Sequence, residues 1–459
     1  FTSQVNYELK TPCKLICTLP NGPDIDLSPN ETFVSPRAVL VCHASTEREL
    51  RGRDIRQTWK GLAPWTHDNP LMLHLTSTAD ETVRTAIDQC AECGFEMVIF
   101  SFGSGLNMED TSAQNIQKFK AFADYAHSKR IRIGGYSLLA SRSVAPEHDV
   151  INPATGKTGG TIFGNSPCLC SSWGLDYFKR IKQFLKETGF DLLEHDGSYP
   201  GDICASTQHP GHRGKQDSQW RQFELIRDLY MWCRKNGIYL NVPDTYFLCG
   251  SNKVGMGYRE TNWSLPRSLQ HIHARQNMFD GTWEKLPSMG WMFVPLVQYH
   301  GGGADATIEP LREHLDDYKR HLDSCLGYGV QACYRGSRLY DGPETKSMVI
   351  RTITKYKKYR KLLESDITHI RRPDGRHIDA IIHTDDANAG RMMLVAYNPA
   401  SSNQSTTLAL PDSLSPYKSI RVIDTVTGKS SNLTPRPNGR FIIDLTVDGG
   451  TMRMLELIQ

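Results

Sequence analysis

Residues 190–202 read FDLLEHDGSYPGD, and this stretch shows how the chain is organised. The largely apolar run 190–193 is typical of a buried strand, and it leads to two acidic residues, Glu194 and Asp196, on either side of His195. The chain then turns through Gly and Pro, which commonly end strands. The sequence therefore places the Asp196 carboxylate at the open end of a buried strand.

Similar strands recur along the chain and alternate with helical stretches. We expect strands at 71–77, 95–103, 131–142, 190–196, 237–244, near 255–260, 290–300 and 328–336. Helical patterns cover 79–93, 112–128, 173–188, 217–235 and 344–364. Such alternation implies parallel strands. Eight strand–helix units in residues 70–365 predict an α/β fold, a (β/α)8 TIM barrel.

Two β-rich regions flank the predicted barrel. Residues 1–69 contain short alternating runs such as TFVSPRAVLVCHAS, which indicate a short N-terminal β segment. In residues 366–459 the apolar pattern has period two, as in HIDAIIHT, RMMLVAYNP and KSIRVIDT, and the turns are rich in Asp, Asn, Gly, Ser and Pro. This pattern predicts a C-terminal antiparallel β-sandwich domain.

Composition excludes several classes of protein. The 459 residues are 39% apolar and 22% charged, with a net charge of +3, which argues against disorder and against a fibre. Acids and bases are interspersed, so no basic stripe for nucleic acid is present. No apolar run approaches the roughly 20 residues of a membrane span. We therefore expect neither a nucleic-acid nor a membrane partner.

The 12 cysteines do not form a recognisable metal motif. Cys90 and Cys93 fall inside a predicted amphipathic helix, and Cys168 and Cys170 are too close together for a common zinc pair. We interpret the cysteines as structural thiols or incidental disulfides, and we expect no metal and no cofactor.

The working residues of a TIM barrel lie at the carboxyl ends of its strands. Asp196 ends the fourth predicted strand and Glu260 ends the sixth. Two carboxylates on different strands suit cleavage of a glycosidic bond. Aromatic and hydrogen-bonding side chains around them suit a sugar ring, and the candidates are His74, Tyr136, Arg142, Glu194, His195, Tyr199, Asp244, Tyr246, Trp263, Arg267, His300, Arg335 and Arg338.

The order and spacing of these motifs resemble the retaining α-galactosidase clan, glycoside hydrolase families 27 and 36, through residues 70–365 and the small C-terminal sandwich. In such enzymes the fourth strand ends in Lys-x-Asp, whose Asp is the nucleophile; DLLEHD puts Asp196 in that place. A Ser-Asp-Asn-like motif followed by Arg ends the sixth strand, and its first Asp is the general acid/base. Here RETNWSLPR puts Glu260 and Arg267 in those places. Residues 70–103 also resemble the first βαβ unit of family 36.

The departures from this family concern the sugar. An Asp-Asp pair that binds galactose hydroxyls is replaced here by Ser101 and Phe102, and the sugar-binding Lys by Glu194. The acid/base is Glu, as in some endo-acting α-N-acetylgalactosaminidases. The resemblance therefore implies a galactose-like sugar of an oligo- or polysaccharide, including sulfated, anhydro or N-acetylated forms. Four cationic side chains are candidates to bind an anionic group, with loop salt bridges as the alternative: Arg142, His195, Arg335 and Arg338.

These observations predict a retaining exo-α-glycosidase. Asp196 would attack the anomeric carbon while Glu260 protonates the leaving oxygen, with the two carboxyl groups about 5–5.5 Å apart. Asp244 is the rival acid/base. Asp305 ranks after both Glu260 and Asp244 for this role, because it begins a helix, where an acid commonly caps free N–H groups. Sugar-polymer chemistry favours a periplasmic or extracellular location.

Two other functions remain open from the sequence. Loss of the galactose-binding acids is compatible with a carbohydrate-binding pseudoenzyme. A metal-dependent hydrolase on the same barrel could instead use His195, His209, His212 and Asp196, although the His spacing departs from common zinc pairs.

Overall fold

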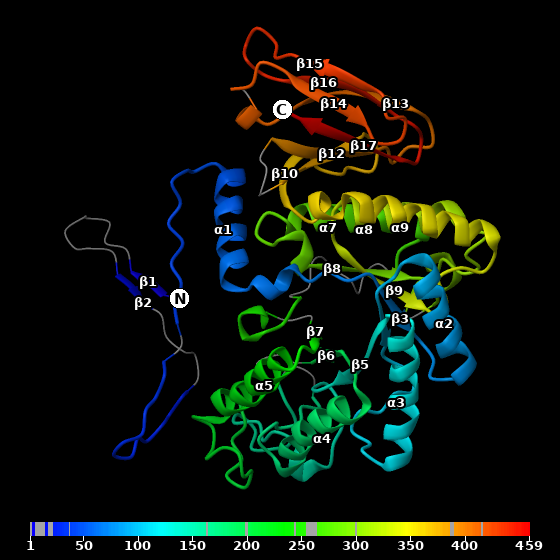
Figure 1. The fold of residues 1–459 in the computed structure, drawn as a ribbon. Helices are drawn as coiled ribbons and strands as arrows, with labels where there is room; N and C mark the ends of the chain where they lie inside the picture. The colour runs from blue at the N-terminus through cyan, green and yellow to red at the C-terminus, as the bar shows by residue number, and fades with distance from the viewer. Residues whose placement is uncertain are drawn as a thin grey trace.

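The chain folds into a barrel-like α/β core with a β domain on one side (Figure 1). The structure is a computed structural model, and it describes residues 2–4, 14–16, 22–35, 37–161, 164–197, 201–242, 245–253, 264–298, 301–385, 390–414 and 416–459. Within these residues, every helix is too short or too polar to cross a membrane.

The core is a parallel sheet of seven strands in the described residues, in the order β7-β6-β5-β4-β3-β9-β8. The strands are β3 (Met72–Leu75), β4 (Met97–Phe100), β5 (Arg132–Leu138), β6 (Leu192–Asp196), β7 (Tyr239–Asn241), β8 (Trp291–Pro295) and β9 (Gln331–Gly336). Each lies within a strand predicted from the sequence. The predicted sixth strand, near 255–260, lies outside the described residues. The described residues therefore form a TIM-like core, but not the closed, eight-stranded barrel that we expected.

Side-chain contacts show that this sheet is strongly curled. His74 on β3 and Glu194 on β6 are three strands apart, which in a flat sheet would separate them by about 14 Å. Instead Nδ1 of His74 lies 3.4 Å from Oε2 of Glu194. The rings of His74 and Trp291, on β3 and β8, are also parallel, with centroids 6.5 Å apart. These side chains consequently meet inside the curl.

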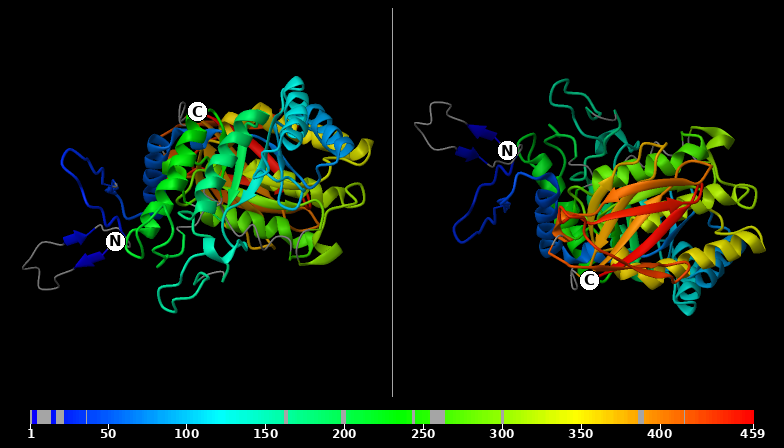
Figure 2. Two further views of the ribbon diagram at one scale, coloured as in Figure 1. Left: turned by 90° about the horizontal axis from the view of Figure 1, so that it is seen from below. Right: turned by 90° about the horizontal axis from the view of Figure 1, so that it is seen from above.

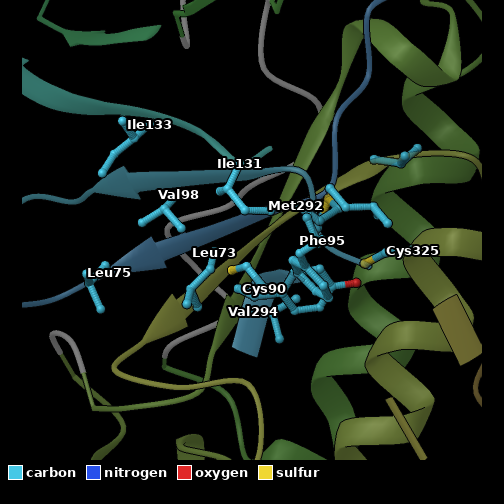
Figure 3. Close-up of a cluster of buried hydrophobic side chains, with 14 of the residues drawn as sticks. Leu73, Leu75, Cys90, Phe95, Val98, Ile131, Ile133, Met292, Val294 and Cys325 are labelled. Atoms are coloured by element: carbon cyan, nitrogen blue, oxygen red, sulfur yellow. The ribbon is translucent and has the colours of Figure 1, made fainter. Parts of the chain in front are cut away.

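Helices cover the outer face of the sheet (Figure 2). They are α2 (Asp80–Cys93), α3 (Ala113–Ser128), α4 (Ser172–Thr188), α5 (Ser218–Lys235), α7 (Arg267–Gly281), α8 (Leu315–Gly327) and α9 (Pro343–Leu363). Short 3-10 helices lie at Pro64–His67, Pro146–His148, Phe247–Cys249, Pro287–Met289, Gly303–Ala306 and Asp412–Leu414. The outward strand residues Leu73, Val98 and Ile133 pack with Cys90 of α2 and with Phe95, as Figure 3 shows. Period-two alternation thus supplies one apolar face for the helices and one for the interior.

The C-terminal domain is an antiparallel sandwich, as predicted. A six-stranded sheet has the order β10-β11-β12-β17-β14-β15, and β13 and β16 form a second sheet. Leu408, Ile443 and Leu445 of the second sheet join Ile382 and Leu394 of the first in one buried cluster. The strands are β10 (Asp366–Arg371), β11 (Asp379–Thr384), β12 (Arg391–Tyr397), β13 (Gln404–Ala409), β14 (Ile420–Asp424), β15 (Ser430–Leu433), β16 (Ile442–Val447) and β17 (Met452–Ile458).

A buried ion pair connects the core to this domain. Nε of Arg275, on α7, lies 3.0 Å from Oδ1 of Asp379, on β11, and Nη2 lies 3.0 Å from Oδ2. Both side chains are at most 3% exposed. Because each charge is buried, each depends on the other for compensation.

The N-terminal region differs from the expectation. β1 (Thr2–Gln4) and β2 (Lys14–Ile16) do pair, and they lie away from the core (Figure 1). However, the described part of 32–45 forms no strand, since its apolar side chains, such as Val34 and Leu40, are exposed and have no sheet to pack on. The longest element in the described part of the region is a helix, α1 (Arg48–Leu62). Arg56 anchors it, with Nε 2.6 Å from Oδ1 of Asp366.

Candidate active site

Strand β6 sends alternate side chains to the two faces of the sheet. Leu192 belongs to an interior cluster with Met72, Met97, Ile99 and Tyr239. Leu193 instead belongs to the core beneath the helices. Glu194 and Asp196 therefore follow Leu192 to the inside, whereas His195 follows Leu193 to the outside.

Asp196 is held at the carboxyl end of β6 by two hydrogen bonds. The Tyr136 hydroxyl, from β5, donates to Oδ2 at 2.8 Å, and the Gly197 amide donates to Oδ1 at 2.8 Å. Gly197 has φ 73°, and a Cβ there would lie 2.6 Å from the Ala140 amide nitrogen, so the turn requires glycine. The carboxylate is thus oriented by its neighbours while its residue stays partly exposed.

A chain of contacts extends from Asp196 across three further strands. The Tyr136 ring packs edge-on against Phe102, with centroids 5.5 Å apart. The carbonyl of Phe102 accepts a hydrogen bond of 2.6 Å from Arg335, near the end of β9, and Ser101 Oγ accepts another of 3.3 Å. Phe102 is itself 41% exposed. The substituted pair Ser101–Phe102 therefore lies on the same rim as Asp196, and Phe102 offers an apolar surface there.

Beneath this rim lies a buried polar pair. His74 is 1% exposed and Glu194 is 6% exposed, with the 3.4 Å separation described above. Asn241, which pairs with Glu194 in the β6–β7 register, is buried beside them. The structure therefore brings His74 and Glu194 together, but inside the core rather than on its open surface.

His195 does not line the open end of the core, contrary to the prediction. Its ring is fully buried between the sheet and the helices, with Nε2 2.9 Å from the Tyr177 hydroxyl of α4 and Nδ1 2.8 Å from the Tyr230 hydroxyl of α5. Burial lowers the pKa of His195 to about 3. A neutral imidazole in this position bridges two helices and has no access to a sugar.

Tyr246 is also placed differently from the prediction. It is 6% exposed and packs against two residues of α5, edge-on against Tyr230 with centroids 5.4 Å apart and stacked on Phe223 at 6.4 Å. It belongs to the main core under the helices. The loop after β7 thus returns to the helix layer at this point, which removes Tyr246 from the sugar-facing set.

Three predicted arginines contact protein groups. Nη1 of Arg142 lies 2.5 Å from Oε1 of Glu109, and Arg338 forms two contacts of 2.8 Å with the Glu309 carboxylate. Arg267 donates at 3.0 Å to the carbonyls of Thr307 and Ala304. For Arg142 and Arg338 these contacts are the loop salt bridges that the sequence left as the alternative.

Arg267 supports the loop after β8. That loop contains Asp305, in the first turn of the 3-10 helix Gly303–Ala306. The other predicted site residues lie outside the described residues: Tyr199, Asp244, Glu260, Trp263 and His300.

The fold also brings together four possible metal ligands that the sequence does not group. Cys168, Cys204, His209 and His212 are buried, and their ligand atoms all lie within 4.8 Å of one another. None of the ten cysteines in the described residues forms a disulfide. The spacing of Cys204, His209 and His212 within one loop was the available signal, but Cys168 comes from a different loop and only the fold brings it near.

The fold resembles solved glycoside hydrolases. The α-galactosidase AgaA of Geobacillus stearothermophilus, of family GH36, matches with a TM-score of 0.61 and 12% identity over 90% of this chain and 59% of that one. A Bacillus halodurans protein assigned as an α-N-acetylgalactosaminidase matches with a TM-score of 0.51 and 13% identity over 85% and 97%. An Anoxybacillus α-amylase matches with a TM-score of 0.53 and 10% identity over 86% and 98%.

These likenesses show the fold alone, because the identities are so low. No protein-family model and no curated protein matches the chain. The chain spans 58–59% of the length of the α-galactosidases compared. The protein therefore has the fold of a group of glycoside hydrolases that includes α-galactosidases, which agrees at the level of fold with the resemblance found in the sequence.

Proposed function

We propose that this protein is a retaining exo-α-glycosidase that acts on a galactose-like sugar of an oligo- or polysaccharide, with Asp196 as its nucleophile. The observation that carries the proposal is the Asp196 carboxylate itself. It ends the fourth strand of a TIM-like sheet, is partly exposed, and is oriented by Tyr136 and Gly197. Active-site residues of such folds come from these strand ends.

The reaction would proceed by two displacements. A carboxylate oxygen of Asp196 attacks the anomeric carbon, the bond from that carbon to the glycosidic oxygen breaks, and Glu260 gives its proton to the departing oxygen. Glu260 then removes a proton from water, which displaces Asp196 and releases the sugar with its α configuration. Tyr136 keeps one carboxylate oxygen fixed through both steps, which preserves the attack geometry. The role of Glu260 follows from the family resemblance.

The surroundings of Asp196 favour an uncharged sugar over a sulfated one. Arg142 and Arg338 already pair with Glu109 and Glu309, and His195 lies on the far side of the sheet. Arg335 is 6% exposed and donates to Ser101 and to the Phe102 carbonyl. Phe102 adds an exposed ring where an α-galactosidase of this clan would have an acid. An N-acetylated or anhydro galactose would place an apolar group against such a ring, so these sugars are the preferred substrates.

The test is hydrolysis of aryl α-glycosides of galactose, N-acetylgalactosamine, glucose and fucose, with the first-formed sugar observed by NMR. The proposal predicts turnover of a galactose-type substrate and the α anomer as the first product. A β anomer would contradict retention. Binding of these sugars without turnover would instead support the carbohydrate-binding alternative.

The alternative of a metal-dependent hydrolase is not supported, because its four proposed ligands do not come together. That alternative requires His195, His209, His212 and Asp196 around one ion. His195 contacts Tyr177 and Tyr230, whereas His209 and His212 face Cys204 and Cys168. We therefore retain the glycosidase as the proposed function.

A further inference from the structure

Two cysteines and two histidines meet in the loops that follow β5 and β6. Cys168 precedes α4, and Cys204, His209 and His212 precede α5. The two cysteines are fully buried, and the histidines are 6% and 7% exposed. A buried group of two thiols and two imidazoles is the ligand set of many structural zinc sites.

The distances between the donor atoms suit a tetrahedral ion. Sγ of Cys168 lies 3.4 Å from Nε2 of His212, and Sγ of Cys204 lies 3.4 Å from Nδ1 of His209. With Zn–S bonds of about 2.3 Å and Zn–N bonds of about 2.0–2.1 Å, a tetrahedral site places sulfur and nitrogen about 3.6 Å apart. The two sulfur–nitrogen pairs, Cys168 with His212 and Cys204 with His209, are therefore already spaced as ligands of one ion.

Surrounding backbone groups orient the donors. Nε2 of His209 lies 3.0 Å from the carbonyl oxygen of Glu147, which favours a proton on Nε2 and leaves the Nδ1 lone pair facing the cluster. The amide of Ile151 donates to Sγ of Cys204 at 3.4 Å, which fixes the position of this sulfur. Such outer contacts accompany metal-binding histidines and cysteines.

A metal would also replace weak contacts within the cluster. Nε2 of the buried His212 ring lies 3.4 Å from the Cys168 thiol, which is a poor hydrogen-bonding group, and a Zn–N bond at Nε2 would take its place. Binding of Zn²⁺ would release the two thiol protons. The two thiolates then balance the charge of the ion, so the buried site is neutral overall.

We propose that Cys168, Cys204, His209 and His212 bind a structural Zn²⁺ ion that cross-links the loop after β5 to the loop after β6. Four protein ligands leave no open position, so the ion holds structure and does not activate water. The proposal does not depend on the glycosidase activity.

The location of the four ligands suggests what the ion would hold in place. The segments 139–171 and 197–217, which connect β5 to α4 and β6 to α5, are both longer than the 2–6 residues typical of such connections. They begin at the strand ends that carry Tyr136 and Asp196. Several direct hydrogen bonds connect them in the described residues, among them the Ala205 amide to the Ile151 carbonyl at 2.8 Å and the Gly211 amide to the Cys170 carbonyl at 2.9 Å. A cross-link here would keep the two loops, and hence this wall of the candidate site, in register.

The first test is metal content of the full chain purified without chelator. We expect about one zinc per chain in the wild type, and loss of most of it in Cys204→Ser and in His209→Ala. Cys170→Ala is the matched control, because Cys170 is equally buried and close in sequence to Cys168 but outside the four ligands. It should keep its zinc. Loss of zinc from this control, or full zinc in both ligand variants, would overturn the assignment.

X-ray absorption at the zinc edge of the wild type covers the case in which the variants fail to fold. The expected first shell has two sulfur atoms at about 2.3 Å and two nitrogen atoms at about 2.0–2.1 Å. A wild type without zinc after purification and after zinc addition, a shell of oxygen and nitrogen only, or a disulfide between Cys168 and Cys204 would each contradict the proposal.

Discussion

His195 and Asp196 are neighbours on β6, yet their side chains lie on opposite sides of the sheet. The His195 ring is fully buried, contacts the hydroxyls of two helices and is held neutral by burial. Asp196 lies at the strand end, partly exposed, with one oxygen bound by Tyr136. Two residues that look equally suited to catalysis in the sequence thus divide into one that packs against the helices and one that lies partly exposed at the strand end.

On a strand of this sheet, the face to which a side chain points therefore decides its role more than the residue type does, because successive side chains point to opposite faces. The inner face of β6 ends in a residue available for chemistry, and the outer face holds the fold together. Variants on the inner rim should change turnover and leave stability unaltered, whereas variants on the outer side and at the domain boundary should do the reverse.

The largest effect is expected for Asp196→Asn. Removal of the nucleophile should lower kcat by about 10⁴-fold or more, equivalent to roughly 5 kcal/mol of transition-state stabilisation. The unfolding temperature should change little, because the amide is nearly isosteric. Turnover of the preferred aryl α-glycoside and a thermal melt measure both. Asp305→Asn, in the exposed loop after β8, is the matched control and should keep its activity. Equal losses of kcat in the two variants would contradict the assignment of Asp196 as the nucleophile.

The buried ion pair of Arg275 and Asp379 lies away from the strand ends, so its loss should lower stability. Arg275→Leu leaves Asp379 buried without compensation and should cost about 3–5 kcal/mol of unfolding free energy at neutral pH. Chemical denaturation followed by fluorescence measures the loss. The double variant Arg275→Leu/Asp379→Leu should regain part of it, since no uncompensated charge then remains. A double variant no more stable than the single one would show that lost packing, and not charge, dominates.

Tyr136→Phe tests the inner rim with a smaller change. A hydrogen bond to a charged group contributes about 1.5–3 kcal/mol, so kcat should fall about 10–100-fold while the fold is kept. Steady-state kinetics beside a thermal melt provide the measurement. An unchanged kcat would mean that the Tyr136–Asp196 bond does not orient the nucleophile.

The outer face should respond to pH. Burial lowers the pKa of His195 to about 3, whereas the unfolded chain has an ordinary histidine pKa of about 6.5. The unfolded state therefore binds more protons between these values, so the stabilising contribution of His195 is full above pH 6.5 and is lost as the pH falls towards 3. From pH 6.5 to 5 this loss is on the order of 1–2 kcal/mol.

The variant His195→Gln isolates this contribution. His321 and His383 have their pKa values lowered in the same way by burial, to about 3 and about 4, and they remain in the variant. Denaturation curves at several pH values should show a shallower acid loss for His195→Gln than for the wild type. Parallel curves would indicate that His195 is protonated in the folded protein.

The smallest effect is expected for Arg338→Gln. This partly exposed arginine pairs with Glu309, and such pairs contribute about 0–1 kcal/mol. Its loss should leave KM and kcat for a neutral sugar nearly unchanged. A large rise in KM confined to a sulfated substrate would restore Arg338 to the sugar-binding set and would revise the preference for an uncharged sugar.

Much of the core could be predicted from sequence because its strands and helices have strong periodicity. Helix α1 was missed because its buried positions are Gly52 and Arg56, which form no apolar stripe. Arg56 is satisfied by Asp366 and by carbonyls of residues distant in sequence, and no local pattern signals such partners. The apolar residues of 32–45 were misread for the converse reason, because an apolar run without a sheet to pack on remains exposed.

The position of a candidate site residue could be predicted where it lies on a strand, but not where it lies in a long loop. Asp196 and Tyr136 were placed correctly at neighbouring strand ends. His195 was misplaced although period two, counted from Leu192, already assigns it to the outer face. Tyr246 and the cluster of Cys168 with Cys204 depend on how long loops fold back, which sequence spacing does not determine.

The most direct test of the central claim is chemical rescue of Asp196→Gly by azide. Glycine removes the nucleophile and leaves room for a small anion in its place. The account predicts that azide restores turnover of the preferred aryl α-glycoside and that the product is the β-glycosyl azide, formed by a single inversion. Restored turnover with an α-glycosyl azide, or rescue absent while Asp196→Gly retains the activity of the wild type, would contradict the assignment of Asp196 as the nucleophile.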